Sequence, residues 1–172
     1  EIREITDEEI SHMDWIYQGV DWGFNPDPYA FIRLYYNRET EKIYLIDEIY
    51  GNKWSNRTTA DEIFDRHYND YVITCDSEDN KSVLDYREFG LAARSAVKGP
   101  GSVNYSMKWL QVRTIVIDPT RTPNAYREFL NYEYDRDKDG NLISGYVDAN
   151  NHTIDACRYA LESVWRKRGH SA

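Results

Sequence analysis

Three acidic residues stand where carboxylates can do chemistry. Asp21 and Asp76 each follow a short apolar run that is typical of a buried strand, and Asp155 lies near the start of a run with helical spacing. A carboxylate at the end of a central strand is costly unless a cation meets it. Hard divalent cations prefer carboxylate oxygens. The three positions therefore predict a divalent-metal site and metal-dependent phosphodiester chemistry.

His152 stands three residues before Asp155, so both side chains share one face of the expected helix. Two ions about 3.5–4 Å apart in such a site can activate water and stabilise a leaving oxygen. We expect Asp21 to bridge both ions, while Asp76 and Asp155 bind one each. His152 is expected to be a ligand, a general acid–base or a hydrogen-bonding neighbour of a ligand. A single Asp after a strand is usually a turn residue, so the prediction rests on the joint occurrence.

A mixed sheet must position these residues. Three aromatic and β-branched runs with short connections predict an antiparallel meander, and the later alternation of strand and helix signals predicts parallel βαβ units. The expected strands are 16–21, 29–36, 42–50, 71–75, 91–97 and 114–117; the expected helices are 55–67, 82–89, 103–112, 124–132 and one beginning near 152. The plan is α/β and ribonuclease-H-like, with helices on both faces. In that plan the first and fourth strands lie side by side, which brings Asp21 and Asp76 together.

Residues 135–141 carry alternating acids and a glycine, like the start of a calcium-binding EF-hand loop. The position that should supply a bidentate Glu is Tyr146, which does not fit such a loop. The favoured interpretation is a protruding β-hairpin that turns near Asp139-Gly140-Asn141, between 131–136 and 142–147.

The composition of the 172 residues narrows the class of protein. No apolar run approaches the roughly 18 residues that span a bilayer, so no membrane partner is expected. Two cysteines, Cys75 and Cys157, suit a reducing cytoplasm and are expected to be small buried side chains. The net charge of −9 predicts weak binding to DNA by this domain alone, because phosphate neutralisation supplies most non-specific affinity.

The chain also resembles a family, the C-terminal nuclease domain of the large terminase subunit of tailed bacteriophages. The resemblance runs from Gly19 to about Trp165, and its order and spacing are more specific than any single motif. Its features are Gly19-Val20-Asp21-Trp22-Gly23, Cys75-Asp76-Ser77, Ala96 to Ser102 with Trp109-Leu110, Asn131 to Tyr134, and Asn151 to Ala156 with Arg158-Tyr159-Ala160.

The resemblance implies an endonuclease that uses Mg²⁺ or Mn²⁺ to cut double-stranded, concatemeric viral DNA before and after head filling. The acidic metal ligands of the family fall on Asp21, Asp76 and Asp155, and His152 matches a histidine of some members. The implied partners are DNA, the terminase small subunit and the portal protein, in the host cytoplasm. The hairpin near 135–147 resembles an element close to the active site of the family.

The ATPase half of that family is absent, since no Gly-x-x-x-x-Gly-Lys-Ser/Thr phosphate loop occurs. With no initiating Met, the chain is expected to be a fragment that cuts DNA without translocating it. Residues 1–15 are expected to be a linker or a short leading helix, and residues 16–172 the nuclease domain. Lys81, Arg94, Lys98 and Lys108 are nominated for DNA contact, although each could be an ordinary surface charge.

Three alternatives stay open. A resolvase or transposase of the same fold would use the same ligands. An actin- or sugar-kinase-like protein could use Gly19 to Gly23 as a phosphate loop, but it would need a duplicated domain and would leave Asp76 and Asp155 without a role. A docking module of a packaging motor could use the fifteen tyrosines and five tryptophans as contact surface.

Overall fold

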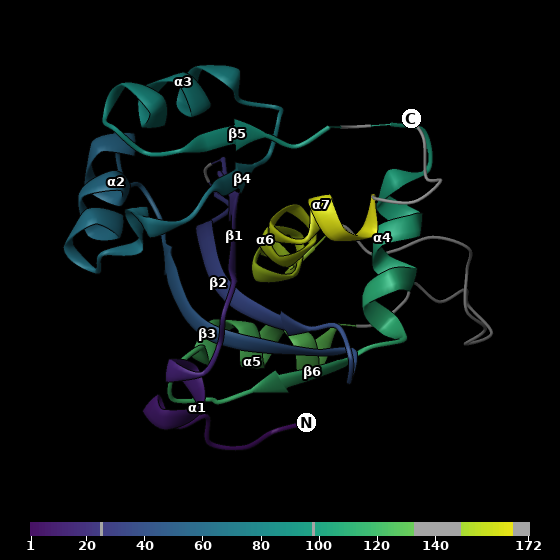
Figure 1. Cartoon of the computed structure of the whole chain (residues 1–172). Coiled ribbons are helices and arrows are strands. Elements are labelled where there is room, and N and C mark those ends of the chain that lie inside the picture. The colour runs from purple at the N-terminus through teal and green to yellow at the C-terminus, as the bar shows by residue number, and fades with distance from the viewer. Residues whose placement is uncertain (25, 98, 133–148, 167–172) are drawn as a thin grey trace.

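The sheet of the computed structural model is mixed and has six strands, in the order β5-β4-β1-β2-β3-β6 (Figure 1). The structure describes residues 1–24, 26–97, 99–132 and 149–166, so Lys98 and the predicted hairpin from residue 133 onward lie outside the described residues. The strands are β1 Ile16–Asp21, β2 Tyr29–Asn37, β3 Lys42–Gly51, β4 Ile73–Cys75, β5 Ala93–Ser95 and β6 Thr114–Ile117. The helices are α1 Asp7–Ser11, α2 Asn56–Asp65, the 3₁₀ turn η1 Tyr68–Asp70, α3 Asn80–Glu88, α4 Ser102–Gln111, α5 Pro123–Asn131, α6 His152–Ala160 and α7 Glu162–Trp165.

The strand pairing confirms the predicted meander and changes one detail. β1, β2 and β3 pair antiparallel, while β4 pairs parallel with β1 and β5 parallel with β4. β6 does not extend this parallel half, because it pairs parallel with β3 at the opposite edge of the sheet. An open edge at β3 would leave backbone N–H and C=O groups unpaired, and β6 pairs with the part of that edge from Lys42 to Leu45.

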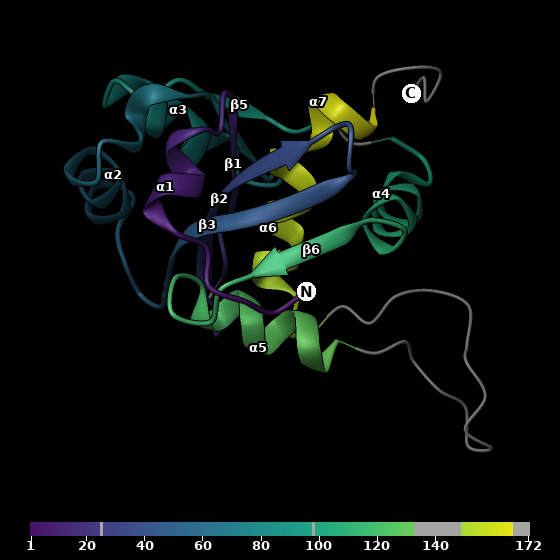
Figure 2. The ribbon, with the colours of Figure 1, turned by 60° about the horizontal axis from the view of Figure 1, so that its bottom comes forward.

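The N-terminal residues pack along that edge. Ile2 forms a parallel bridge with Ile117, and the backbone N–H of Ile117 donates to the carbonyl oxygen of Glu1 over 2.9 Å. Ile5 is buried, with 1% of its surface exposed. Figure 2 shows this segment beside β6, ahead of the short helix α1. The division between residues 1–15 and 16–172 stays a prediction.

β4 begins two residues later than predicted, at Ile73. Nε2 of Gln18 donates to the carbonyl oxygens of Tyr68 over 2.9 Å and Tyr71 over 3.1 Å. A buried side chain of β1 thus binds backbone groups just ahead of β4, and Val72 stays half exposed. Apolar residue types alone do not reveal such a contact, which is why the sequence predicts a strand that is two residues too long.

Side chains of β2 point alternately to the two faces of the sheet, and the core has one cluster on each face. Ala30, Ile32 and Leu34 face one cluster, which also contains residues of α4, α5 and α6, whereas Tyr29 and Phe31 face a second cluster with α2 and α3. The helices therefore cover both faces of the sheet, as predicted (Figure 1). Both cysteines are buried free thiols. Among the described residues, no helix is long and apolar enough to cross a membrane.

Gly19 lets α6 lie directly on β1. A Cβ at this position would stand 2.1 Å from the carbonyl oxygen of Ala156 and 2.6 Å from the backbone nitrogen of Ala160. Neither backbone atom can turn aside as a flexible side chain would. The absence of a side chain at Gly19 therefore fixes how closely the helix that carries His152 and Asp155 approaches the sheet.

The substitution Gly19→Ala should destabilise the fold by about 3 kcal/mol, the upper range of overpacking costs. Urea denaturation would measure the loss. Gly101→Ala is the matched control, since a Cβ there meets nothing within 4 Å but the backbone φ is +72°. That variant should lose only about 1 kcal/mol, the conformational cost of a left-handed residue. Equal losses for the two variants would contradict the close approach.

Candidate functional site

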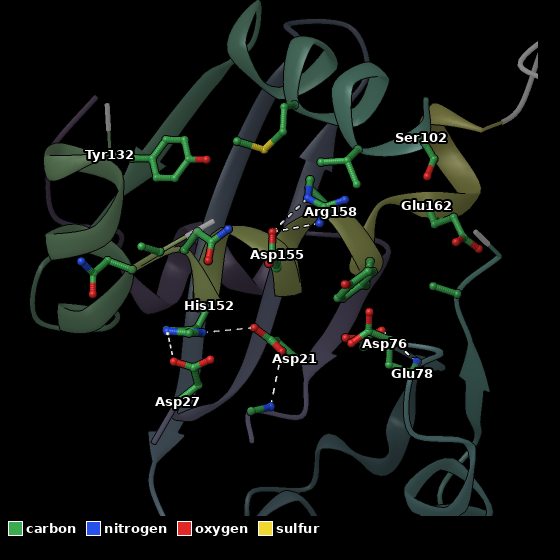
Figure 3. A pocket seen from close by; sticks show the side chains of 18 of the residues that line it. Asp21, Asp27, Asp76, Glu78, Ser102, Tyr132, His152, Asp155, Arg158 and Glu162 are labelled. Carbon is green, nitrogen blue, oxygen red and sulfur yellow. Dashed lines mark hydrogen bonds and ion pairs between the residues drawn. The ribbon is translucent and has the colours of Figure 1, made fainter. Parts of the chain in front are cut away.

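Asp21 and Asp76 lie next to each other at the ends of two neighbouring parallel strands. The register pairs Val20 with Cys75, and the backbone N–H of Asp76 donates to the carbonyl oxygen of Val20 over 3.0 Å. Nε1 of Trp22 donates to the carbonyl oxygen of Asp76 over 3.0 Å, which fixes the turn after β4. The predicted juxtaposition of the two carboxylates at this end of the sheet is thus observed (Figure 3).

The first turn of α6 brings the other two predicted residues to the same place. His152 begins the helix and Asp155 follows one turn later. Nδ1 of His152 lies 3.4 Å from Oδ2 of Asp21, so the helix start meets the end of β1 (Figure 3). All four predicted residues line one pocket of about 560 Å³. A pocket of that size has room for a ligand as well as ions.

Burial and mutual contact shift the proton affinities of Asp21 and His152. Burial raises the pKa of the Asp21 carboxyl, the contact with His152 lowers it in part, and the nearby charge of Asp76 raises it further. The contact with Asp21 raises the pKa of His152 above its ordinary value, although burial opposes this. On the other side of the ring, Nε2 of His152 lies 3.9 Å from Oδ1 of Asp27, a pocket residue that the sequence did not single out.

The raised pKa of His152 predicts that the metal-free protein loses stability as the pH rises. The folded state holds this proton more tightly than the unfolded state, so the stabilisation is present below the ordinary value of 6.5 and is lost as the pH passes the higher folded value. The raised pKa of Asp21 acts in the same direction at lower pH. Thermal melts in EDTA from about pH 6 to pH 9 would measure the effect.

The control for this prediction is a second histidine. His152→Gln should flatten the pH dependence relative to wild type, whereas His12→Gln, at an exposed residue after α1, should retain it. Parallel curves for wild type and His152→Gln would contradict the ion pair with Asp21.

Arg158 is a site residue that sequence reasoning missed as a functional group. It is 6% exposed, and its Nε and Nη2 donate to Oδ1 of Asp155 over 3.1 and 2.9 Å. Its Nη1 donates to Oγ of Ser106 in α4 over 3.1 Å. The signal was present, because Asp155 and Arg158 are three residues apart on one helix. The guanidinium holds the Asp155 carboxylate within the pocket (Figure 3).

The cations nominated for DNA contact do not line this pocket in the described part of the chain. Arg94 donates its Nη2 to Oε1 of Glu162 over 2.7 Å and so anchors β5 to α7. Lys81 in α3 and Lys108 in α4 are exposed, and Lys98 lies outside the described residues. Contact of these four residues with DNA stays a prediction.

The pocket residues fit a hard divalent cation by the chemistry of their donors. In the part of the chain that the structure describes, the lining includes six acidic residues, Asp21, Asp27, Asp76, Glu78, Asp155 and Glu162, against one arginine. No group of three or more His, Cys, Asp or Glu side chains in that part is yet arranged to hold one ion. Oδ1 of Asp155 accepts from Arg158, and Oδ2 of Asp21 lies beside Nδ1 of His152, so each of these carboxylates is oriented by a neighbouring basic side chain.

Known proteins are similar to this chain in sequence and in fold. The sequence model of the Terminase RNAseH like domain matches residues 21–163. The large terminase subunit of Bacillus phage SPP1 is 44% identical over 168 residues, which cover 96% of this chain and 40% of the relative. The PBSX phage terminase large subunit of Bacillus subtilis is 32% identical over 145 residues, which cover 84% of this chain and 33% of the relative. The chain thus spans well under half the length of these relatives.

Solved structures agree with the sequence comparison. The g2p large terminase nuclease domain of bacteriophage SPP1, solved with bound Mn, has a TM-score of 0.90 and 43% identity, with 95% of each chain covered. The nuclease domain of the P22 large terminase has a TM-score of 0.66 at 19% identity, with 87% of this chain and 80% of that chain covered, and supports the fold alone. The predicted ribonuclease-H-like fold and the predicted resemblance are confirmed. The chain belongs to the Terminase RNAseH like domain family.

Proposed function

We propose that this chain is a divalent-metal-dependent endonuclease domain that cleaves double-stranded viral DNA concatemers during genome packaging. The observation that carries the proposal is the convergence of Asp21, Asp76, Asp155 and His152 on one pocket. The SPP1 g2p nuclease domain, which is 43% identical and matches 95% of this chain, was solved with bound Mn, and this supports the same activity here.

Asp21, Asp76 and Asp155 are the proposed ligands for Mg²⁺ or Mn²⁺, with Asp21 as the central one. Bound metal would supply an activated water nucleophile and stabilise the leaving oxygen. His152 holds Asp21 in place through its Nδ1 and is the group that can take up or release a proton near neutral pH. Arg158 keeps the Asp155 carboxylate oriented and adds positive charge where a phosphate would approach.

DNA must approach a chain of net charge −9. Bound metal would offset the acidic lining of the pocket, and Lys81, Arg94, Lys98 and Lys108 are the proposed contacts to the phosphate backbone. We expect the binding of this domain to DNA to weaken as salt rises, because contacts to phosphate release counterions.

The setting is proposed from the family. The partners would be the terminase small subunit and the portal protein, and the site of action the cytoplasm of the infected host. Translocation of DNA needs an ATPase, and no phosphate-binding Gly-x-x-x-x-Gly-Lys-Ser/Thr loop occurs in these residues. The proposed task of this domain is therefore cutting.

A plasmid-nicking assay tests the proposal. The protein is incubated with supercoiled plasmid in Mn²⁺, Mg²⁺ or EDTA, beside Asp76→Ala as the site variant and Asp65→Ala, at an exposed residue of α2, as the control. Cutting should require metal, be lost in Asp76→Ala and persist in Asp65→Ala. Absence of cutting with either metal, from folded protein, would instead favour a docking module. Equal cutting by Asp76→Ala would overturn the assignment of the site.

A further inference from the structure

Helix α6 carries half of the proposed metal site, yet the side chain of its N-cap residue does not cap its first turn. Asn151 at the N-cap makes no side-chain capping hydrogen bond. The first N–H groups of a helix have no partner within the helix and need one from elsewhere. Two of them, the backbone N–H groups of Thr153 and Ile154, donate to Glu128, a residue of α5 that is 3% exposed and lies outside the pocket lining.

Glu128 binds the start of α6 with both a charge and a defined geometry. Its Oε1 accepts hydrogen bonds from the backbone N–H of Thr153 over 2.7 Å, the hydroxyl of Thr153 over 2.6 Å and the backbone N–H of Ile154 over 3.3 Å. Its Oε2 accepts from the hydroxyl of Tyr50 in β3 over 3.3 Å. A carboxylate at a helix N-terminus is favoured by the helix dipole, and its hydrogen bonds are stronger than those of a neutral acceptor.

Helix α5 is held in the same way by the sheet. Its N-cap, Thr122, makes no side-chain capping hydrogen bond. Glu48 of β3 accepts from the backbone N–H of Ala125 over 2.9 Å, and from the backbone N–H and Nδ2 of Asn124 over 3.1 and 2.6 Å. Two buried carboxylates in succession therefore connect β3 to α5 and α5 to α6.

We propose that Glu128 is a positioning residue for metal binding, which holds the first turn of α6, and with it His152 and Asp155, beside the ends of β1 and β4 that carry Asp21 and Asp76. His152 precedes Thr153 in the chain, and Asp155 follows Ile154, so the two capped backbone groups are bracketed by the two site residues. A tilt of the first turn would move both away from the strand ends. The inference rests on the proposed function, since it concerns the same site.

The affinity for Mn²⁺ separates positioning from a general loss of stability. Isothermal titration of Mn²⁺ into wild type, Glu128→Gln and Glu128→Ala, at a temperature where all are folded, should show a Kd about 10- to 100-fold weaker for Glu128→Ala. Glu128→Gln keeps an acceptor oxygen but lacks the charge, so its Kd should lie between the values for wild type and Glu128→Ala. Ile63→Val, in the core cluster on the other face of the sheet, is the control that lowers stability and should leave the Kd unchanged.

Hydrogen exchange gives a second test that does not involve metal. The amides of Thr153 and Ile154 in metal-free Glu128→Gln should exchange faster than in wild type, while amides of α3 should not change. An unchanged Kd in Glu128→Ala, or unchanged exchange at these amides in Glu128→Gln, would overturn the inference about Glu128. Absence of Mn²⁺ binding by wild type would instead overturn the proposed metal site and the inference with it.

Discussion

Asp21→Asn should reduce DNA cleavage by roughly 10³-fold, the upper range for removal of one preorganised electrostatic group, and should leave the fold intact. Asp21 lies at the end of β1 between Asp76 and the start of α6, so it is the carboxylate that ions on either side would share. Asparagine keeps the shape of the side chain but lacks the charge that a hard cation requires. Initial rates of plasmid nicking in Mn²⁺ would measure the loss.

The same substitution should not lower the stability of the metal-free protein. Burial raises the pKa of Asp21, and a raised folded pKa means that stability is lost as the pH rises through it. The ionised side chain therefore opposes folding at neutral pH, and asparagine removes that charge. Thermal melts in EDTA should place Asp21→Asn at or above wild type. Asp65→Asn, at an exposed residue, is the matched control and should cut like wild type.

A variant that loses both activity and folding would not support this interpretation, since it would indicate a structural role for Asp21. Wild-type-like cutting by folded Asp21→Asn would remove the central ligand from the proposed site. The expected pair of results, less activity with equal or greater stability, is typical of a site whose charges are arranged for a ligand and not for the fold.

The sequence predicted β1, which carries Asp21, and the strands β2, β3 and β6 because local patterning decides them. β1 and β6 match the predicted ranges, and β2 and β3 each extend one residue further, since aromatic and β-branched residues with turns between them leave little freedom. The pairing of β1 with β4 followed from the fold plan and placed the two carboxylates together. The spacing of His152 and Asp155 on one helix face predicted their shared pocket.

The contacts that position α6 could not be predicted in the same way. No local pattern distinguishes Glu128 and Glu48 from ordinary charged residues of a helix and a strand. They cap α6 and α5 because α5 packs between β3 and α6. The edge at which β6 pairs depends on the side of the sheet to which the chain returns. Local sequence patterns do not determine that side. Arg158 was visible as a neighbour of Asp155, but its burial was not.

Divalent metal should raise the melting temperature of the wild-type chain. A ligand that binds only the folded state at about 100 times its Kd adds about 2.7 kcal/mol of stability. For a chain of this size that corresponds to a rise of about 5–10 °C in Tm. The effect should be large because the described lining of the pocket contains six acidic residues and one arginine. A bound cation would reduce the repulsion among these carboxylates. Differential scanning fluorimetry with and without millimolar Mn²⁺ would measure it.

Screening must be separated from binding, because added salt also weakens repulsion between carboxylates. Sodium chloride at equal ionic strength is therefore the control, and it should reproduce only a small part of the rise. Asp21→Asn and Asp155→Asn should lose most of the Mn²⁺ effect, whereas Asp65→Asn should keep it. If sodium chloride and Mn²⁺ gave equal shifts, the carboxylates would be repelling one another without sharing an ion. A rise specific to Mn²⁺ and lost in both site variants would mean that Asp21, at the end of β1, and Asp155, on α6, bind the same metal site.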